Sequence, residues 1–381
     1  MKPKGPAESY ILSSSPHTRA ASSVSDIMLD VVIGLLPALV CGISMIWRAD
    51  AAAGLNALFV TGTCVASCIL TEMACRRLMG REQTVGDLSC VVTGLILAST
   101  LPPGLPLWMC AAGSVFAIAI AKQVFGGLGY NPFNPAAAGR AFMLVSFTGA
   151  MTTWSRSGWL ASFAQPGAAR PFAAQFAEYA TDGAVATGAT PLGVLKNAEC
   201  AADFASGNWQ FAADLFFGDV NGSIGEISAL ALLIGGCYLL ARRVITWHVP
   251  ASFILSVFVF AFAAAPLGPL GESCGGRAFY ALVHVLSGGV MIGAFFMATD
   301  MVTGPYTDRG RLVFGCGCGV LTMLIRLYGS YPEGVSFAIL IMNAFVPIIN
   351  RWTRPRPFGR REALALAKAK AKASRAGGES K

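Results

Sequence analysis

Apolar residues dominate ten stretches of the chain, and short polar connections or helix breakers separate them. These candidate membrane segments are residues 27–47, 52–75, 88–101, 107–124, 137–152, 223–241, 250–266, 278–299, 312–328 and 335–350. A straight helix needs about 20 apolar residues to cross a bilayer, so several segments are too short to cross unaided. The pattern predicts an all-α integral membrane protein of about ten transmembrane helices, some of them broken into half-helices.

The breaks fall at matching places in two halves of five segments each. Residues 101–106 and 129–135 interrupt the first half, and residues 300–305 and 329–334 interrupt the second half at a shift of about 200 positions. Because five is an odd number, the second half would run in the opposite sense across the membrane. We therefore expect two inverted five-helix repeats, an arrangement that places transporter binding sites near the middle of the bilayer.

Composition supports a membrane protein and excludes a soluble one. The 381 residues are 55% hydrophobic and only 13% charged, whereas soluble domains carry about 25% charged residues. The net charge of +8 would suggest nucleic acid in a soluble protein. Much of it lies in the tail after the last apolar segment, which indicates membrane orientation instead. We expect no nucleic-acid partner.

The positive charges also predict a topology. Most basic connections lie on the same side as the tail, so the positive-inside rule places both termini in the cytoplasm. The expected parts are a cytoplasmic N-terminal segment (1–26), a first membrane repeat (27–152), an extracytoplasmic loop (153–222), a second membrane repeat (223–350) and a basic cytoplasmic tail (351–381). The first apolar run follows a polar segment, so we expect no cleaved signal peptide.

The eleven cysteines do not indicate a metal or iron–sulfur centre. None of them forms a Cys-x-x-Cys pair, and most lie within apolar segments, where a small hydrophobic residue is the ordinary role. Cys200 and Cys274 fall in predicted loops, and the sequence leaves open whether they form a disulfide.

Three acidic residues beside the breaks or inside apolar runs are candidate ion-binding groups. Asp300 ends a predicted half-helix, where the partial negative charge disfavours a carboxylate unless a cation is near; an ordinary loop position is the alternative. Asp87 opens the third segment, where a helix cap is the simpler explanation. Glu72 lies in an apolar run, which favours a functional role, although a pair with Arg76 explains it equally well.

Two further stretches carry candidate chemistry. In residues 131–140, Asn134 is placed to cap a helix that begins at Pro135, and Arg140 would suit an anionic group or a neighbouring acid. In the loop 153–222, a run of small residues leaves the hydroxyl of Thr190 sterically open. From composition alone, an ordinary Gly/Thr turn is the alternative.

The chain resembles a known family at stretches distributed over roughly 350 residues. These stretches are residues 13–18, 121–135, 188–192, 222–226, 293–300, 331–334 and 353–359. They resemble the membrane protein RnfD of the Rnf ion-translocating oxidoreductase complex, and they are similar to the homologous NqrB of the sodium-pumping NADH:quinone oxidoreductase. The last stretch, residues 353–359, looks like the Rnf protein rather than the quinone-reductase protein.

The resemblance implies a covalent cofactor and an ion route. In that family a separate flavin transferase attaches flavin mononucleotide (FMN) through a phosphoester to the threonine that corresponds to Thr190. Family members usually have an acid where this chain has Ala184, so the effect of Ala184 on flavin attachment stays open. The resemblance also implies that Asp87 and Asp300 line the cation path. At Asn350 the family often has an acid.

The implied protein is a flavoprotein component of a redox-driven pump in the bacterial inner membrane. The complex would couple electron flow between ferredoxin and NAD to movement of Na⁺ or H⁺. Partner subunits would hold the iron–sulfur clusters, the NADH site and a further flavin. A second, non-covalent flavin in this chain is left open. The alternatives are a channel or transporter for a small solute, because fold does not settle function, and a flavin-free structural protein of a membrane complex.

Overall fold

The computed structural model describes residues 23–152, 192, 209–218, 220, 222–265, 274–329 and 333–355. Helices account for all the regular structure within these ranges. In the first half they are α1 (Val24–Ala49), α2 (Ala51–Leu78), η1 (Val85–Asp87), α3 (Ser89–Ser99), α4 (Leu107–Val115), η2 (Phe116–Gln123), α5 (Pro135–Ser146) and α6 (Thr148–Met151). The rest are α10 (Trp209–Phe217), α11 (Ala229–Ala241), α12 (His248–Ala264), α13 (Cys274–Leu286), α14 (Val290–Ile292), η5 (Gly293–Met297), α15 (Asp308–Tyr328) and α16 (Val335–Thr353).

The helices fall into long and short apolar elements. Among the described residues, α1, α2, α15 and α16 are each long and apolar enough to cross a membrane. The pair formed by α13 and α14–η5 is also long and apolar enough to cross if it is counted as one span, which is bent by 64°. Each of the ten predicted apolar segments contains a helix, but α3, α4–η2, α11 and α12 are shorter than a straight crossing needs. The number of ten crossings therefore stays a prediction.

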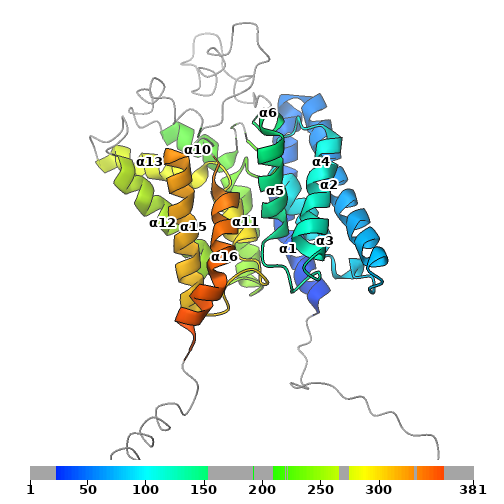
Figure 1. Ribbon diagram of the computed structural model, residues 1–381. Coiled ribbons are helices and arrows are strands. Elements are labelled where there is room, and N and C mark those ends of the chain that lie inside the picture. Colours follow the sequence, from blue (N-terminus) through cyan, green and yellow to red (C-terminus); the bar gives the residue numbers. More distant parts are fainter. Residues whose placement is uncertain are drawn as a thin grey trace, which may run out of the picture.

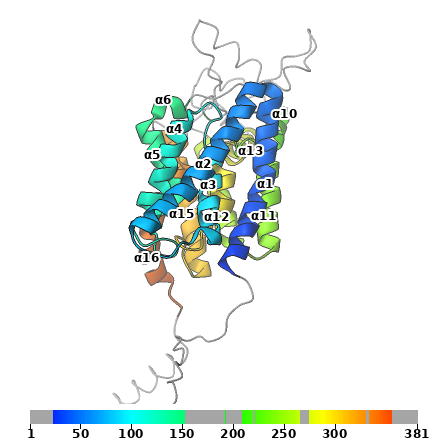
Figure 2. The same cartoon turned by 90° about the vertical axis from the view of Figure 1, so that its right-hand side faces the viewer.

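The two halves share part of their packing, and they meet along two pairs of helices. In the first half α2 packs on α3 and α4, and in the second half α12 packs on α13 and α15. Contacts between the halves run along α1 with α11 and along α5 with α16. The first-half helices form one side of the bundle in Figure 1, and Figure 2 shows α1 beside α11.

The two ends of the bundle differ. The start of α1 and the end of α16 lie at the same end, and α6 and α10 lie at the opposite end (Figure 1). The side of the membrane on which each end of the bundle lies stays a prediction. The segment 153–222 was expected to be a loop, but it includes α10, which packs on α13 and α11.

The second half completes the broken end of α3. This helix ends at Ser99, ahead of the predicted break. The backbone N–H of Ile224 donates to the Leu101 carbonyl (3.0 Å), and that of Gly225 donates to the Ser99 carbonyl (2.8 Å). A backbone carbonyl left unpaired at membrane depth costs several kcal/mol, so these bonds make the break tolerable. They also tie the two halves together inside the bundle.

Candidate functional site

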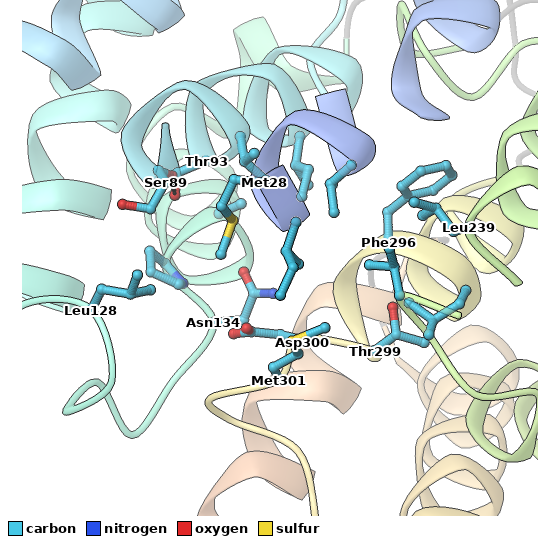
Figure 3. A pocket seen from close by; sticks show the side chains of 18 of the residues that line it. Met28, Ser89, Thr93, Leu128, Asn134, Leu239, Phe296, Thr299, Asp300 and Met301 are labelled. Atoms are coloured by element: carbon cyan, nitrogen blue, oxygen red, sulfur yellow. Dashed lines mark hydrogen bonds between the residues drawn. The ribbon is translucent and has the colours of Figure 1, made fainter. Parts of the chain in front are cut away.

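A cavity, named here the large cavity, lies between the two halves, toward the end of the bundle where α1 begins. Its volume, counted together with space open to solvent, is about 760 Å³, and its lining is mainly apolar. Figure 3 shows Ser89 and Thr93 of α3 on one side, with Phe296 of η5 and Thr299 on the other. A largely apolar cavity with a few polar groups is typical of a small-molecule or cofactor site.

Asp300 lies on the wall of this cavity, in the turn beyond η5. Its Oδ1 accepts from the backbone N–H of Val302 (3.2 Å), and its Oδ2 accepts from the hydroxyl of Thr303 (2.9 Å). Burial raises the pKa of Asp300 above its ordinary value, and these two hydrogen bonds oppose that rise. Asp300 is thus a carboxyl group at a cavity, held by its own turn, where a proton or cation could bind it.

Lys122 also lines the cavity, and it is the centre of a buried polar network. Its Nζ lies 2.7 Å from Oε2 of Glu72 and donates to the Ser89 hydroxyl at 2.7 Å. The other oxygen of Glu72 accepts from the hydroxyl of Thr84 (2.9 Å). Glu72 therefore pairs with Lys122, and the alternative of a pair with Arg76 is wrong. Helix packing brings Lys122, which is 50 positions away in the sequence, into contact with Glu72, whereas Arg76 is only one helical turn away and does not pair with it.

Asp87 meets the cavity only indirectly. It is the last residue of η1, and its Oδ1 accepts from the backbone N–H of Ser89 (3.0 Å) and from the Ser89 hydroxyl (2.6 Å). The residue that caps α3 is Leu88, without a side-chain bond, so Asp87 is not the cap considered from the sequence; its carboxylate holds Ser89, the first residue of the helix. Ser89 connects Asp87 to Lys122 and lines the cavity together with Asp300. The two predicted acids thus belong to one region but come from different halves.

Two asparagines complete the cavity. Asn134 caps α5 by accepting from the Ala137 N–H (3.1 Å), and Pro135 is the first helical residue, so both predictions are confirmed. The Asn134 amide also donates to the carbonyl of Met297 (3.0 Å) in the second half. The Oδ1 of Asn131 is buried with no hydrogen-bond partner among the described residues. It leaves an acceptor at the cavity for a ligand N–H.

A second polar cluster lies farther along the interface between the halves. Arg140 of α5 donates to Oε1 of Glu226 (2.6 Å) and also to a carboxylate oxygen of Glu333. The Ser223 hydroxyl donates to the other oxygen of Glu226 (2.9 Å). The expectation that Arg140 would meet an acid is confirmed, although its two acids come from the other half of the chain.

The predicted flavin attachment residue, Thr190, lies outside the described residues, as do Ala184 and the side chains of Cys200 and Cys274. Leu192, two positions after Thr190, is described and buried. It lines a cavity of about 350 Å³ together with Leu215 of α10, Ser287 and Gly288. The chain next to Thr190 is thus anchored on the part of the bundle near α10.

Sequence reasoning missed Lys122 and the two acids around Arg140. Charge alone would place Lys122 among the basic groups that mark the cytoplasmic side, but it is 1% exposed within η2. A single charged residue inside the apolar stretch 107–124 was the available signal, because such residues are rarely placed there without a partner. Glu226 lies in the predicted apolar segment 223–241, and Glu333 lies in the predicted break 329–334, so both offered the kinds of signal that singled out Glu72 and Asp300.

Comparison with known proteins gives a consistent result over nearly the whole chain. Residues 11–359 match the model of the NQR2, RnfD, RnfE family. The chain is 43% identical over 350 residues to the D subunit of the Na⁺-translocating ferredoxin:NAD⁺ oxidoreductase complex of Acetobacterium woodii, covering 91% of this chain and 95% of that protein. It is 41% identical to the D subunit of the proton-translocating ferredoxin:NAD⁺ oxidoreductase complex of Clostridium ljungdahlii, covering 92% and 97%.

Proposed function

Since the chain belongs to the NQR2, RnfD, RnfE family, we propose that it is the RnfD membrane protein of an ion-translocating ferredoxin:NAD⁺ oxidoreductase complex of the Rnf type. The observation that carries the proposal is 43% identity over 91% of the chain to the corresponding protein of such a complex. The long apolar helices suit residence in the bacterial inner membrane. Partner subunits would supply the iron–sulfur clusters, the NADH site and a second flavin-bearing chain.

The cofactor of this protein is FMN, attached by a phosphoester to Thr190. Three features support it: the small residues 188–189 that leave the hydroxyl accessible, the burial of the nearby Leu192, and the position of α10 at the end of the bundle opposite the start of α1. A flavin supplies one-electron transfer, and the protein contributes its placement. A separate flavin transferase would form the bond.

Replacement of Thr190 tests this cofactor assignment. The protein is expressed with a flavin transferase, denatured in SDS, and examined for fluorescence under ultraviolet light. We expect a fluorescent band for the wild type and for Thr187→Ala, and no fluorescence for Thr190→Ala, because only the last threonine has the Ala-Thr-Pro-Leu context. A dark wild-type band would show that Ala184 in place of the usual acid prevents attachment, and would favour a flavin-free structural role.

The ion, Na⁺ or H⁺, would cross along the interface between two inverted five-helix repeats. The support is the corresponding contacts of α2 and α12 within their own halves, and the position of Asp300, Lys122 and Asn131 around one cavity at the interface. The mainly apolar walls of the same cavity suit a second, non-covalent flavin. Asp87 would act on this route through Ser89.

A small-solute transporter is the second candidate, favoured by the cavity between the halves. Such a transporter has no use for a covalent flavin. The fluorescence of the Thr190 band therefore separates the two functions without any knowledge of the solute.

A further inference from the structure

The connection after α2 and the connection after η2 meet at the end of the bundle where α1 begins. The hydroxyl of Ser25 in α1 donates to the carbonyl of Gly86 (2.9 Å), which holds the first connection at that end. Nη1 of Arg81 donates to the carbonyl of Gly126 (3.0 Å), which brings the second connection beside the first. The two connections therefore form one surface, at the end of the bundle predicted to face the cytoplasm.

Three glycines of the second connection have a backbone conformation that other residues rarely adopt. Their φ angles are +126° at Gly126, +99° at Gly127 and +94° at Gly129. A Cβ atom on Gly127 would also lie 2.6 Å from Nη2 of Arg76. Glycine is thus required at this position both by the backbone and by the close approach of a guanidinium group. Residues 126–129 are named here the glycine loop.

The surface around the glycine loop is positively charged. Three arginines of this surface form no ion pair within the described residues: Arg76, Arg77 and Arg81. The acids of the same connection are the exposed Glu82 and Asp87, whose carboxylate is bonded to the start of α3. Glu72, one helical turn before Arg76, is held by Lys122. The arginines therefore outnumber the acids that could neutralise them.

Two side chains at the glycine loop have buried polar atoms without a hydrogen-bond partner among the described residues. Nη1 of Arg76 donates to the carbonyl of Glu82 (3.3 Å), but Nε of Arg76 has no partner. Gln123 is completely buried, and both its amide nitrogen and its amide oxygen lack a partner. Its Oε1 would lie 3.5 Å from a Cβ atom on Gly127, so both side chains approach the same glycine. Unpaired groups of this kind are rare, and they indicate a ligand or water at this junction.

Exposed apolar side chains border the arginines on both helices. Leu78, the last residue of α2, is 87% exposed, and Val124 and Phe125, which follow η2, are exposed as well. Because α2 packs on η2, these side chains belong to the same region. Tyr130, just beyond the glycine loop, is also exposed, and tyrosine is enriched where lipid meets water. An apolar surface next to a positive one matches the acyl chains and headgroup of an anionic lipid.

The two ends of the chain do not suit this surface as occupants. Basic residues outnumber acidic ones by 3 to 1 in residues 1–22 and by 8 to 2 in residues 356–381. Since like charges repel, neither segment complements the arginines. The cytoplasmic leaflet of a membrane, in contrast, carries anionic lipids, which attract basic residues at its surface.

From this geometry we propose that Arg76, Arg81 and the glycine loop bind the phosphate of an anionic phospholipid in the leaflet at this end of the bundle. The phosphate oxygens accept from the two guanidinium groups, and the acyl chains lie along Leu78 and Val124. The inference requires that the chain resides in a membrane, but it rests on neither the flavin nor the ion route.

The bound lipid would stabilise one wall of the large cavity. Leu128 of the glycine loop lines that cavity, and so does Asn131, which follows the loop. A phosphate held by Arg76 and Arg81 fixes the loop from outside, because Arg81 already holds the carbonyl of Gly126. The lipid is therefore expected to act on the cavity without entering it.

The test measures lipid binding to the complete chain, purified in detergent, by native mass spectrometry. Dioleoyl phosphatidylglycerol is the anionic probe, and dioleoyl phosphatidylcholine has the same acyl chains without a net charge. We expect the wild type to bind the anionic lipid more tightly. Arg81→Gln should weaken this binding about fivefold, the factor that one basic residue near a membrane surface contributes. Arg81 is exposed, so this replacement leaves the helix packing intact.

Two controls separate a built site from general attraction. Arg351→Gln removes an exposed arginine from α16 in the other half, at the same end of the bundle, and should bind the lipid as the wild type does. Inorganic phosphate, added at the concentration of the lipid, should not displace it, because a free anion has no acyl chains to bury. Arg76→Gln should act in the same direction as Arg81→Gln.

Four results would overturn the inference. Equal binding of the two lipids by the wild type would remove the anionic headgroup from the account, and unchanged binding by Arg81→Gln would remove the site. An equal loss in Arg351→Gln would show attraction to the whole surface. Displacement by inorganic phosphate would assign the site to a free anion. If Arg81→Gln binds lipid normally but its complex loses another subunit, the surface is a protein interface and the lipid assignment fails.

Discussion

Lys122 shows how strongly a single buried charge depends on its partners. Its ammonium group lies 2.7 Å from Glu72, and both side chains are almost fully buried. Breaking a buried pair leaves one uncompensated charge, which is far more costly than the pair itself is favourable. The two residues are 50 positions apart, so local sequence could suggest only Arg76 as the partner of Glu72.

We expect Lys122→Met to destabilise the protein by about 3–5 kcal/mol, because Glu72 would stay buried without its cation. The double variant Lys122→Met/Glu72→Met should recover much of this loss, since no charge then remains in the apolar interior. Thermal melting of the detergent-purified protein measures both. Arg351→Gln, at an exposed position near the end of α16, is the control and should leave the melting temperature unchanged. A double variant no more stable than Lys122→Met would contradict this account.

At the scale of elements, close helix contact at glycines fixes how α1 meets α11. A Cβ atom on Gly235 of α11 would lie 1.9 Å from the carbonyl oxygen of Gly34 of α1. Small residues permit this approach of backbones, which is a principal source of attraction between helices in membranes. The wall of the large cavity depends on the contact, because α1 and α11 both contribute to it.

Gly235→Ala should therefore lower the melting temperature of the purified protein. The methyl group forces α1 and α11 apart, and overpacking of this kind costs about 1–3 kcal/mol. Gly62→Ala in α2 is the matched control, because nothing lies within 4 Å of its added Cβ. Alanine is preferred over glycine in a helix by up to about 1 kcal/mol, so this control should melt at the same or a higher temperature. Equal melting temperatures of the two variants would show that the α1–α11 contact does not limit the stability of the protein.

Two elements, η2 and η5, are π-helices, and the sequence did not reveal them. The element η2 carries Lys122, and η5 carries Phe295 and Phe296; all three side chains line the large cavity. Such insertions occur frequently at functional sites, because they redirect side chains within a helix. Apolar periodicity predicts only that helices are present here, since one extra residue per turn leaves little trace in so apolar a chain.

The whole molecule places its large cavity toward the start of α1 and its Arg140 cluster toward the other end of the same interface. An ion that enters from the end where α1 starts would meet Asp300 first. Burial raises the pKa of Asp300, so its neutral form persists to higher pH than in an exposed aspartate. Its contribution to stability is therefore present below the ordinary pKa and lost as the pH rises through the raised one.

Asp300→Asn is expected to slow coupled ion transport while leaving the covalent flavin in place. The amide keeps the size of the carboxyl group but cannot bind or release a proton, and it attracts a cation less strongly. Ion uptake by the reconstituted complex and fluorescence of the SDS-denatured band are the two measurements. Transport at the wild-type rate in this variant would remove Asp300 from the ion route.

The sequence by itself determined the features that depend on neighbours along the chain. Apolar runs predicted the helices and their breaks, and Asn134 with Pro135 predicted the start of α5, because capping is a local interaction. Tertiary structure alone decided which buried charges meet. Arg140 reaches Glu226 and Glu333 across 86 and 193 positions, and Lys122 reaches Glu72 across 50. Such pairs form only when separate helices pack, since a sequence fixes the contacts of a helix with itself but not those with its neighbours.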